Sequence, residues 1–211
     1  MRLSRYGIVL ESLSSDHLEM VRLWRNQEFV RCNMEFKELL SREDQERWFS
    51  TLDQSNNLYW VIRTHDYPIG LIHIKNLNYE LTEGEAGIFI GEPSYLDMPQ
   101  SMLAILFMME MAFLGLGLKH LKAKIRSGND HAISFNKKLG YELVPNQPEG
   151  FQYYSVTEEK FLNATEKLRS QAQHMYGVET VIVQVSVHNG LKTKLISGLT
   201  KSDQYFNPKF V

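Results

Sequence analysis

Cysteine, long apolar segments and an excess of one charge are all scarce in this sequence of 211 residues. The one cysteine, Cys32, excludes an internal disulfide bond and a metal site built from several thiolates, and it fits a reducing compartment. The 23 basic and 25 acidic residues leave a net charge of -2, which argues against nucleic acid and anionic membranes as partners. The first residues lack the apolar core of a signal peptide, and the seven histidines show no metal-ligand spacing. We therefore expect a cytoplasmic protein with no metal, no nucleic-acid partner and no membrane partner.

One segment, Met102 to Leu118, is apolar enough to raise the question of a membrane span. It is shorter than the roughly 20 residues that a span requires. Glu110 also lies near its middle, where a carboxylate is costly inside a bilayer. The four methionines of the segment suit the irregular filling of a protein core. We interpret the segment as a buried helix.

The apolar pattern predicts a mixed α+β architecture. Alternating or continuous apolar residues predict strands at residues 6–13, 58–63, 69–75, 85–91, 120–126, 141–144 and 152–156. Helical spacing predicts helices that begin after caps at Ser14 and Ser41, and further helices at 102–118 and in the 130s. The length suits one domain over residues 1–160 and a smaller extension over residues 161–211.

Residues 120–141, HLKAKIRSGNDHAISFNKKLGY, carry the most specific pattern in the chain. A strand with one apolar face ends at a Ser-Gly-Asn-Asp break, and a short helix then ends at Gly140, where a positive φ is common. An ordinary strand and helix with a glycine cap is one interpretation. The segment also resembles the N-x-x-A/S-I-x-x-Y/N-x-K-x-G-F/Y signature of the GNAT acetyltransferase superfamily. That resemblance implies that Asn129 and Asn136 bind the pantetheine arm of acetyl-CoA.

Two further segments narrow the resemblance to the branch of ribosomal-protein N-terminal and nucleotide-amino-sugar N-acetyltransferases. The first is W-R-N-x-E-x-V-R-x-x-M, which begins at Trp24, followed by S-x-E-x-Q-x-x-W-F from Ser41. The second is Ile69-Gly70 with EAGIFIG from Glu85. The resemblance covers roughly residues 1–160. It implies the GNAT fold, a mixed β-sheet that is splayed open where the cofactor enters and flanked by helices.

The implied chemistry is direct transfer of an acetyl group from acetyl-CoA to a primary amine. The resemblance places the backbone donors that polarise the thioester carbonyl around Phe89, Ile90 and Gly91. It makes Glu85 the candidate general base, whereas a solvated carboxylate at a strand end is the alternative interpretation. Glu83, Glu92 and His73 are further candidates in the same region of the sheet.

Two departures from the family pattern bear on catalysis and cofactor binding. The tyrosine that usually returns a proton to the CoA thiolate is replaced by Asn136, so that role is vacant or falls to water or to Tyr141, Tyr153 or Tyr154. The pyrophosphate loop Q/R-x-x-G-x-G/A is replaced by Leu96-Asp97-Met98-Pro99-Gln100-Ser101. Pro99 lacks an N–H donor, and Asp97 brings negative charge or caps the helix. We still assign cofactor binding to the loop residues Leu96, Met98, Gln100 and Ser101.

The acceptor pocket of the family is bordered by its first two helices. The candidate substrate-binding residues are therefore Trp24, Arg25, Asn26 and Arg31, together with His73; Trp24 also suits a core. An arginine there favours a phosphate or carboxylate, because its planar guanidinium can bond two oxygens at once. Arg25 and Arg31 can meet one ligand only if the helix bends or breaks between them, since six residues separate them.

Beyond residue 160 we expect a C-terminal extension with a helix and a β-hairpin. Ser155-x-x-Glu158 is a capping box for a helix that runs to about Gln173. Valines then alternate from Val181 to Val187 and lead to the Asn189-Gly190 turn of a hairpin. The valine face must cover the catalytic domain, pair with a sheet edge or meet a second subunit. We favour a homodimer through the hairpin, or a lid.

The leading functional hypothesis is an acetyl-CoA-dependent N-acetyltransferase for a small-molecule amine, preferably a nucleotide-linked amino sugar. One alternative keeps the chemistry but changes the acceptor to a protein N-terminus. Another is a GNAT-fold binding module that has lost catalysis, which the changes at Pro99, Ser101 and Asn136 would fit. These hypotheses separate on whether the turn at Pro99 still presents free N–H groups.

Overall fold

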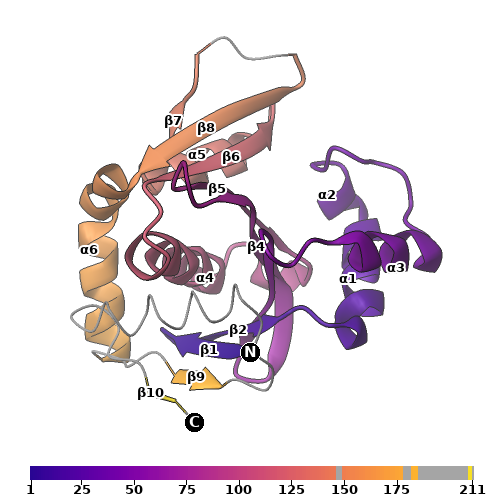
Figure 1. Ribbon diagram of the computed structural model, residues 1–211, viewed down its shortest axis with the longest axis horizontal. Coiled ribbons are helices and arrows are strands. Elements are labelled where there is room, and N and C mark those ends of the chain that lie inside the picture. Colours follow the sequence, from indigo (N-terminus) through magenta and orange to yellow (C-terminus); the bar gives the residue numbers. More distant parts are fainter. Residues whose placement is uncertain (146–148, 178–181, 185–208, 211) are drawn as a thin grey trace.

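A single mixed sheet runs through the protein, and the helices lie on its two faces (Figure 1). The computed structural model describes residues 1–145, 149–177, 182–184 and 209–210. The strands are β1 Arg2–Arg5, β2 Ile8–Ser12, β3 Leu58–Thr64, β4 Tyr67–Asn78, β5 Glu83–Ile90, β6 His120–Arg126, β7 Glu142–Leu143, β8 Phe151–Thr157, β9 Ile182–Gln184 and β10 Lys209–Phe210. The helices are α1 Leu18–Asn26, α2 Glu28–Arg31, α3 Arg42–Thr51, α4 Pro99–Glu110, α5 Asp130–Lys138 and α6 Glu158–Tyr176.

The strands lie in the order β10-β9-β1-β2-β3-β4-β5-β6-β8-β7. The pairs β5–β6 and β9–β10 are parallel, and the other pairs are antiparallel. The main core lies between the sheet and α4, where Trp60, Ile62 and Ile72 join the buried helix residues. A smaller core on the other face joins Val21 and Trp24 of α1 to Val61 and Leu71. The predicted α+β fold with a mixed sheet is confirmed.

Three local predictions need correction. The first predicted strand is a hairpin of β1 and β2, because Tyr6 and Gly7 both have positive φ and form a tight turn. The first predicted helix is two helices, α1 and α2, with Gln27 extended between them. The cap of α6 is Thr157, which accepts the N–H of Lys160, whereas Ser155 still belongs to β8.

The structure also explains the carboxylate in the apolar segment. Helix α4 ends at Glu110, and one π-helical turn, Met111–Gly115, completes the predicted helix. Glu110 is 2% exposed, lies 3.2 Å from Arg5 Nε and accepts the Tyr6 hydroxyl at 3.1 Å. Burial raises the pKa of Glu110, and Arg5 and Tyr6 oppose that rise. Among the described residues, no helix is long and apolar enough to span a membrane.

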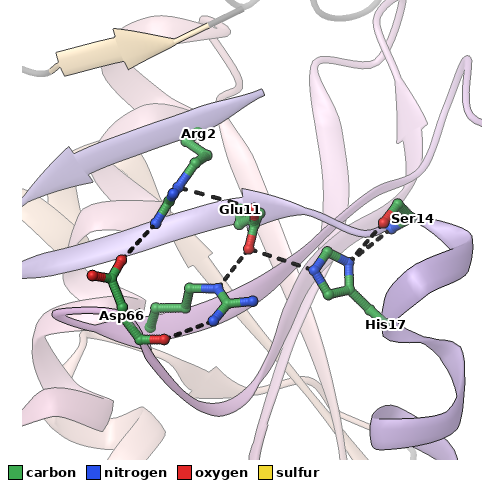
Figure 2. A network of polar contacts seen from close by, with 6 residues as sticks. Arg2, Glu11, Ser14, His17 and Asp66 are labelled. Atoms are coloured by element: carbon green, nitrogen blue, oxygen red, sulfur yellow. Dashed lines mark hydrogen bonds and ion pairs between the residues drawn. The ribbon is translucent and has the colours of Figure 1, made fainter. Parts of the chain in front are cut away.

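A second polar network ties the start of α1 to the sheet (Figure 2). His17 Nδ1 accepts the N–H of Ser14 at 3.1 Å, while Nε2 faces Glu11 at 3.4 Å. Glu11 also accepts from Arg63 at 2.5 Å and lies 4.0 Å from Arg2. Burial raises the pKa of Glu11, but the bond from Arg63 and the nearby positive charges outweigh it and lower that pKa. The network fixes the point from which α1 leaves the sheet.

The predicted C-terminal hairpin lies mostly outside the described residues. Its described part is β9, which pairs antiparallel with β1, while β10 pairs parallel with β9. We had considered that the valine face covers the catalytic domain, pairs with a sheet edge or meets a second subunit. For residues 182–184 the structure shows the second of these, pairing with a sheet edge. The subunit contact that we favoured stays a prediction.

Candidate active site

The sheet opens between β5 and β6. The two strands pair only from Glu83 to Glu85 among the described residues, and β5 then continues to Ile90 beside β4 alone. The N–H of Gly91 donates to Ile69 of β4 at 2.9 Å. Because N–H groups alternate between the two edges of a strand, the N–H groups of Ile88 and Ile90 face the opening. Of the three residues that the sequence analysis named, Ile90 thus has its N–H toward the opening, whereas the N–H groups of Phe89 and Gly91 face β4. The role of these donors in polarising the thioester stays a prediction.

The N-terminus of α4 is open. Its cap residue is Met98, an extended residue whose side chain makes no capping hydrogen bond, and Pro99 occupies the first turn. Asp97 therefore does not cap the helix, contrary to one of our interpretations. Proline is tolerated at this position because the first N–H of a helix has no intrahelical partner. The first turn thus retains the uncapped N–H groups and the positive end of the helix dipole that favour an anion.

The other residues of the loop lie around this turn. Leu96 and Met98 are exposed, and the Ser101 hydroxyl donates to the Met98 carbonyl at 3.1 Å. Gln100 is partly buried, and its Oε1 has no hydrogen-bond partner among the described residues. The loop is therefore accessible to a ligand, and its assignment to cofactor binding stays a prediction.

Both predicted asparagines of the 120–141 motif use their amides within α5. Asn129 caps the helix and accepts the N–H of Ala132 at 3.1 Å. The Asn136 amide donates to the Ala132 carbonyl at 2.8 Å. Gly140 ends the segment with φ +90°, as expected, and an added Cβ would lie 2.8 Å from the Lys160 carbonyl oxygen.

The tyrosines considered as proton donors differ in their surroundings. The Tyr141 hydroxyl is buried with no hydrogen-bond partner among the described residues, and burial raises the pKa of that phenol. Tyr154 donates to Gln152 at 2.9 Å. Tyr153 lies on the β8 position opposite Lys124.

Glu85 lies where the pairing of β5 with β6 ends, on the sheet face covered by α1 and α3. Its carboxylate pairs with Lys75 at 2.9 Å and contacts the Asn76 amide at 3.4 Å. The side chain is 22% exposed, so water reaches it. A carboxylate at the vertex of the opening suits a general base that acts directly or through a water.

His73 lies next to Glu85 on the same face, but its chemistry differs. Its ring lies tilted by 30° against the Tyr59 ring, with centroids 4.9 Å apart, and it contacts Gly87, where an added Cβ would be 2.5 Å from the imidazole. Burial, with a smaller contribution from Lys75, lowers the pKa of His73 to about 3. A neutral imidazole of such low basicity is a poor proton acceptor at pH 7 but can bond a substrate. Burial and Glu85 raise the pKa of Tyr59, which the sequence analysis did not select, to about 12.

Arg25 is the most unusual charge in this region. It lies in the last turn of α1, and its Nη1 is buried with no hydrogen-bond partner among the described residues. Burial lowers the pKa of the guanidinium, and no carboxylate opposes that effect. A desolvated cation without a counterion is costly in a folded protein. An anionic ligand would remove that cost.

Trp24 and Asn26, on either side of Arg25, have structural contacts. Trp24 is 3% exposed, donates to Glu92 at 3.0 Å and lies against Gly91, where a Cβ would be 2.2 Å from the indole. The Asn26 amide accepts from and donates to the Leu40 backbone at 2.8 and 2.9 Å. These contacts position the helix and the following segment around Arg25. Whether either side chain also touches substrate stays a prediction.

The break that Arg25 and Arg31 require does occur, at Gln27. The Gln27 side chain donates to the Gly91 carbonyl at 3.1 Å and so joins the break to the end of β5. Arg31 donates to the Lys37 carbonyl at 2.7 Å and pairs with Glu28. Arg31 therefore holds residues 32–40, which we call the 32–40 segment and which contains no helix or strand.

The 32–40 segment crosses to β6, a relationship that sequence reasoning missed. Lys124 of β6 pairs with Glu35 at 2.7 Å, and Arg126 donates to the Cys32 carbonyl. Figure 1 shows α2, which leads into this segment, beside the opening of the sheet. The two contacts join residues 89 and 94 positions apart, and no local pattern marks such pairs.

Comparisons with known proteins agree with this geometry. A CoA and spermine complex of spermidine N-acetyltransferase from Vibrio cholerae aligns with a TM-score of 0.67 at 16% identity, covering 74% of this chain and 99% of that one. A domain from Methanocaldococcus jannaschii aligns with a TM-score of 0.64 at 21% identity, covering 71% and 97%. The Vibrio enzyme is also known in a dodecameric form, which aligns at 0.60 and 16% identity over 74% and 97%. No curated protein sequence matches this chain.

The match to a sequence family is more specific than these structural similarities. Residues 8–142 match the model of the acetyltransferase (GNAT) domain, and this range includes β2 to β6 and α1 to α5. The open sheet and the uncapped helix α4 described above both lie within that range. The chain belongs to the GNAT acetyltransferase family, and the prediction of an acetyl-CoA-dependent N-acetyltransferase is confirmed.

Proposed function

We propose that this enzyme acetylates a small primary amine that carries an anionic group, with a nucleotide-linked amino sugar as the preferred acceptor. The observation that carries the proposal is the Arg25 guanidinium. Its Nη1 is buried without a hydrogen-bond partner among the described residues, and no carboxylate of those residues opposes the lowering of its pKa by burial. A phosphate accepts two parallel bonds from such a group. The position of Arg25 beside Trp24, which contacts the end of β5, supports a role at the acceptor side of the opening.

We infer the binding site of acetyl-CoA, the acetyl donor, from the first turn of α4 and the unpaired edge of β5. The uncapped N–H groups after Met98 would hold the pyrophosphate of acetyl-CoA, and α5 with Asn129 would border its pantetheine arm. When bound, acetyl-CoA supplies the thioester whose carbonyl carbon the amine attacks. The N–H groups of Ile88 and Ile90 would stabilise negative charge on that carbonyl oxygen.

Proton transfer would depend on Glu85. Its carboxylate would accept a proton from the acceptor ammonium, while Lys75 keeps it oriented. Asn136 cannot donate a proton as an acid, and its amide is bonded to Ala132. Tyr141 is buried, and its raised pKa makes proton release harder. We therefore assign the return of a proton to the thiolate to water.

Two other acceptors fit the same observations less well. A polyamine, the substrate of the Vibrio cholerae enzyme, would bring positive charge to the already desolvated Arg25. A basic protein N-terminus would meet the same repulsion from Arg25. A blocked turn at Pro99 would have favoured the binding-module alternative, whereas the open cap at Met98 supports the enzyme.

The test is an assay of thiol release from acetyl-CoA with four acceptors: a uridine-diphosphate-linked amino sugar, the same amino sugar without phosphate, a dipeptide and spermidine. We expect turnover with the phosphate-bearing acceptor, and a decrease in its kcat/KM of about 10-fold or more in Arg25→Met. Arg25→Lys should retain part of the activity. Arg47→Met is the matched control, because Arg47 pairs with Asp44 on the exposed surface of α3. Equal turnover of the phosphate-free sugar, or full activity of Arg25→Met, would overturn the proposal.

A further inference from the structure

Lys124 lies on β6 just beyond the point where the pairing of β6 with β5 ends. The last residue pair between β5 and β6 is Glu85 with Lys122, and Lys124 lies two residues further along β6 on the same face of the sheet. At that point β5 is no longer paired with β6, so the Lys124 ammonium projects where the sheet is open. Its side chain is only 21% exposed.

The carboxylate that pairs with Lys124 differs from those of the neighbouring lysines. Lys75 pairs with Glu85 and Lys122 with Glu83, and each of these pairs joins adjacent strands in the closed part of the sheet. Glu35, by contrast, belongs to the 32–40 segment and is 71% exposed. An ion pair with one exposed partner contributes little to stability, because water solvates the Glu35 carboxylate well when it leaves the lysine. Glu35 can therefore be replaced by another anion at low cost.

Aromatic rings keep Lys124 in place without Glu35. The ammonium lies 4.8 Å from the centroid of the Phe151 ring and 5.7 Å from that of Tyr153, both on β8. A cation over aromatic faces is held by their electrostatic attraction. If Glu35 leaves, the cation keeps its position, which is the condition for a preorganised binding group.

We propose that Lys124 is a specificity residue that binds the anionic group of the acceptor, and that Glu35 occupies this cation until the acceptor displaces it. The proposal rests on the proposed function, because it assumes an acceptor with an anionic group. Displacement of Glu35 would free the 32–40 segment at one of its two contacts with β6, while Arg126 keeps the other at Cys32. Binding of the acceptor and movement of this segment are then coupled.

The experiment measures the dissociation constant of uridine diphosphate by calorimetry, with saturating CoA present so that the pyrophosphate site at α4 is filled. We expect Lys124→Met to weaken binding about 10-fold, Lys124→Arg to restore it, and Glu35→Gln to strengthen it several-fold. Lys122→Met is the matched control and should leave the constant unchanged, since Lys122 pairs within the closed part of the sheet. Thermal unfolding of each variant checks that the fold is intact.

The outcomes separate the two proposals. If Arg25→Met abolishes binding whereas Lys124→Met and Glu35→Gln leave it unchanged, the role of Lys124 is wrong and the proposed function stands. If the wild-type enzyme does not bind uridine diphosphate, and spermidine binds instead, both are wrong. As a second measurement, hydrogen exchange in the 32–40 segment should increase when uridine diphosphate is added. Unchanged exchange in the presence of bound ligand would contradict the displacement of Glu35.

Discussion

Arg5 Nε lies 3.2 Å from Glu110 Oε2 inside the protein, where the two side chains are 4% and 2% exposed. The pair joins β1 to the end of α4. It explains why the most apolar segment of the sequence contains a carboxylate, since Glu110 is the partner of Arg5. A buried ion pair is weak evidence for stability, because desolvation offsets the attraction between the charges. Removal of one partner is a different matter, since a buried charge is left behind.

Glu110→Leu is therefore expected to lower the free energy of unfolding by about 3–5 kcal/mol. The reason is that the variant removes the carboxylate facing Arg5 and the acceptor of the Tyr6 hydroxyl. Urea denaturation at pH 7 measures the change. The double variant Arg5→Met/Glu110→Leu should regain most of the loss, because neither charge then remains. A single variant as stable as the wild type would contradict the prediction.

The lowered pKa of His73 predicts a pH dependence of stability. The folded protein keeps this imidazole neutral down to about pH 3, whereas the unfolded chain binds a proton near pH 6.5. The unfolded state therefore binds more protons between these values, and stability falls as the pH decreases. Between pH 7 and pH 5 this residue alone should account for a loss of about 2 kcal/mol.

The measurement is the free energy of unfolding in urea at pH 7 and at pH 5, for the wild type and for His73→Gln. The variant should lose less stability than the wild type over this interval. His131→Gln is the control, since His131 is exposed. Parallel pH profiles for the wild type and His73→Gln would show that the histidine titrates normally in the folded state.

Met98→Asp tests the open N-terminus of α4 in two directions. An aspartate at the cap position would accept the first N–H groups of the helix and raise stability by about 1 kcal/mol. The same carboxylate would occupy the donors proposed for the pyrophosphate and repel it, so we expect CoA affinity to fall about 10-fold or more. Thermal unfolding and calorimetric titration with CoA measure the two effects, with Met98→Ala as the control. Unchanged CoA affinity in a stabilised variant would exclude this turn as the pyrophosphate site.

Local signals in the sequence predicted much of the fold. The cap of α3 is as expected, with Ser41 accepting the N–H of Asp44 at 3.0 Å, and Gly140 closes α5 with a positive φ. The periodicity of apolar residues gave a wrong prediction where a tertiary contact determines the backbone conformation. Gln27 interrupts a regular helical pattern because its side chain bonds the Gly91 carbonyl, a partner that lies far away in the sequence.

The candidate site was predictable in its strands and less so in its charges. The apolar pattern predicted the strand over residues 85–91. Its register against β4, which leaves the N–H groups of Ile88 and Ile90 facing the opening, is seen only in the structure. By contrast, the pairing of Lys124 with Glu35 depends on the path of a segment without regular structure. The sequence analysis named Arg25 as a substrate-binding candidate. It did not predict that Arg25 Nη1 is buried without a hydrogen-bond partner among the described residues.

The pairing of β9 with β1 has a consequence for synthesis on the ribosome. Arg2 lies opposite Gln184, so one edge of β1 lacks this partner strand until residues 182–184 have left the exit tunnel. An exposed strand edge is a template for association with other chains. In a nascent or shortened chain that stops after α6, this edge of β1 would be exposed to solvent without its β9 partner. We therefore expect the pairing of residues 182–184 with β1 to reduce aggregation.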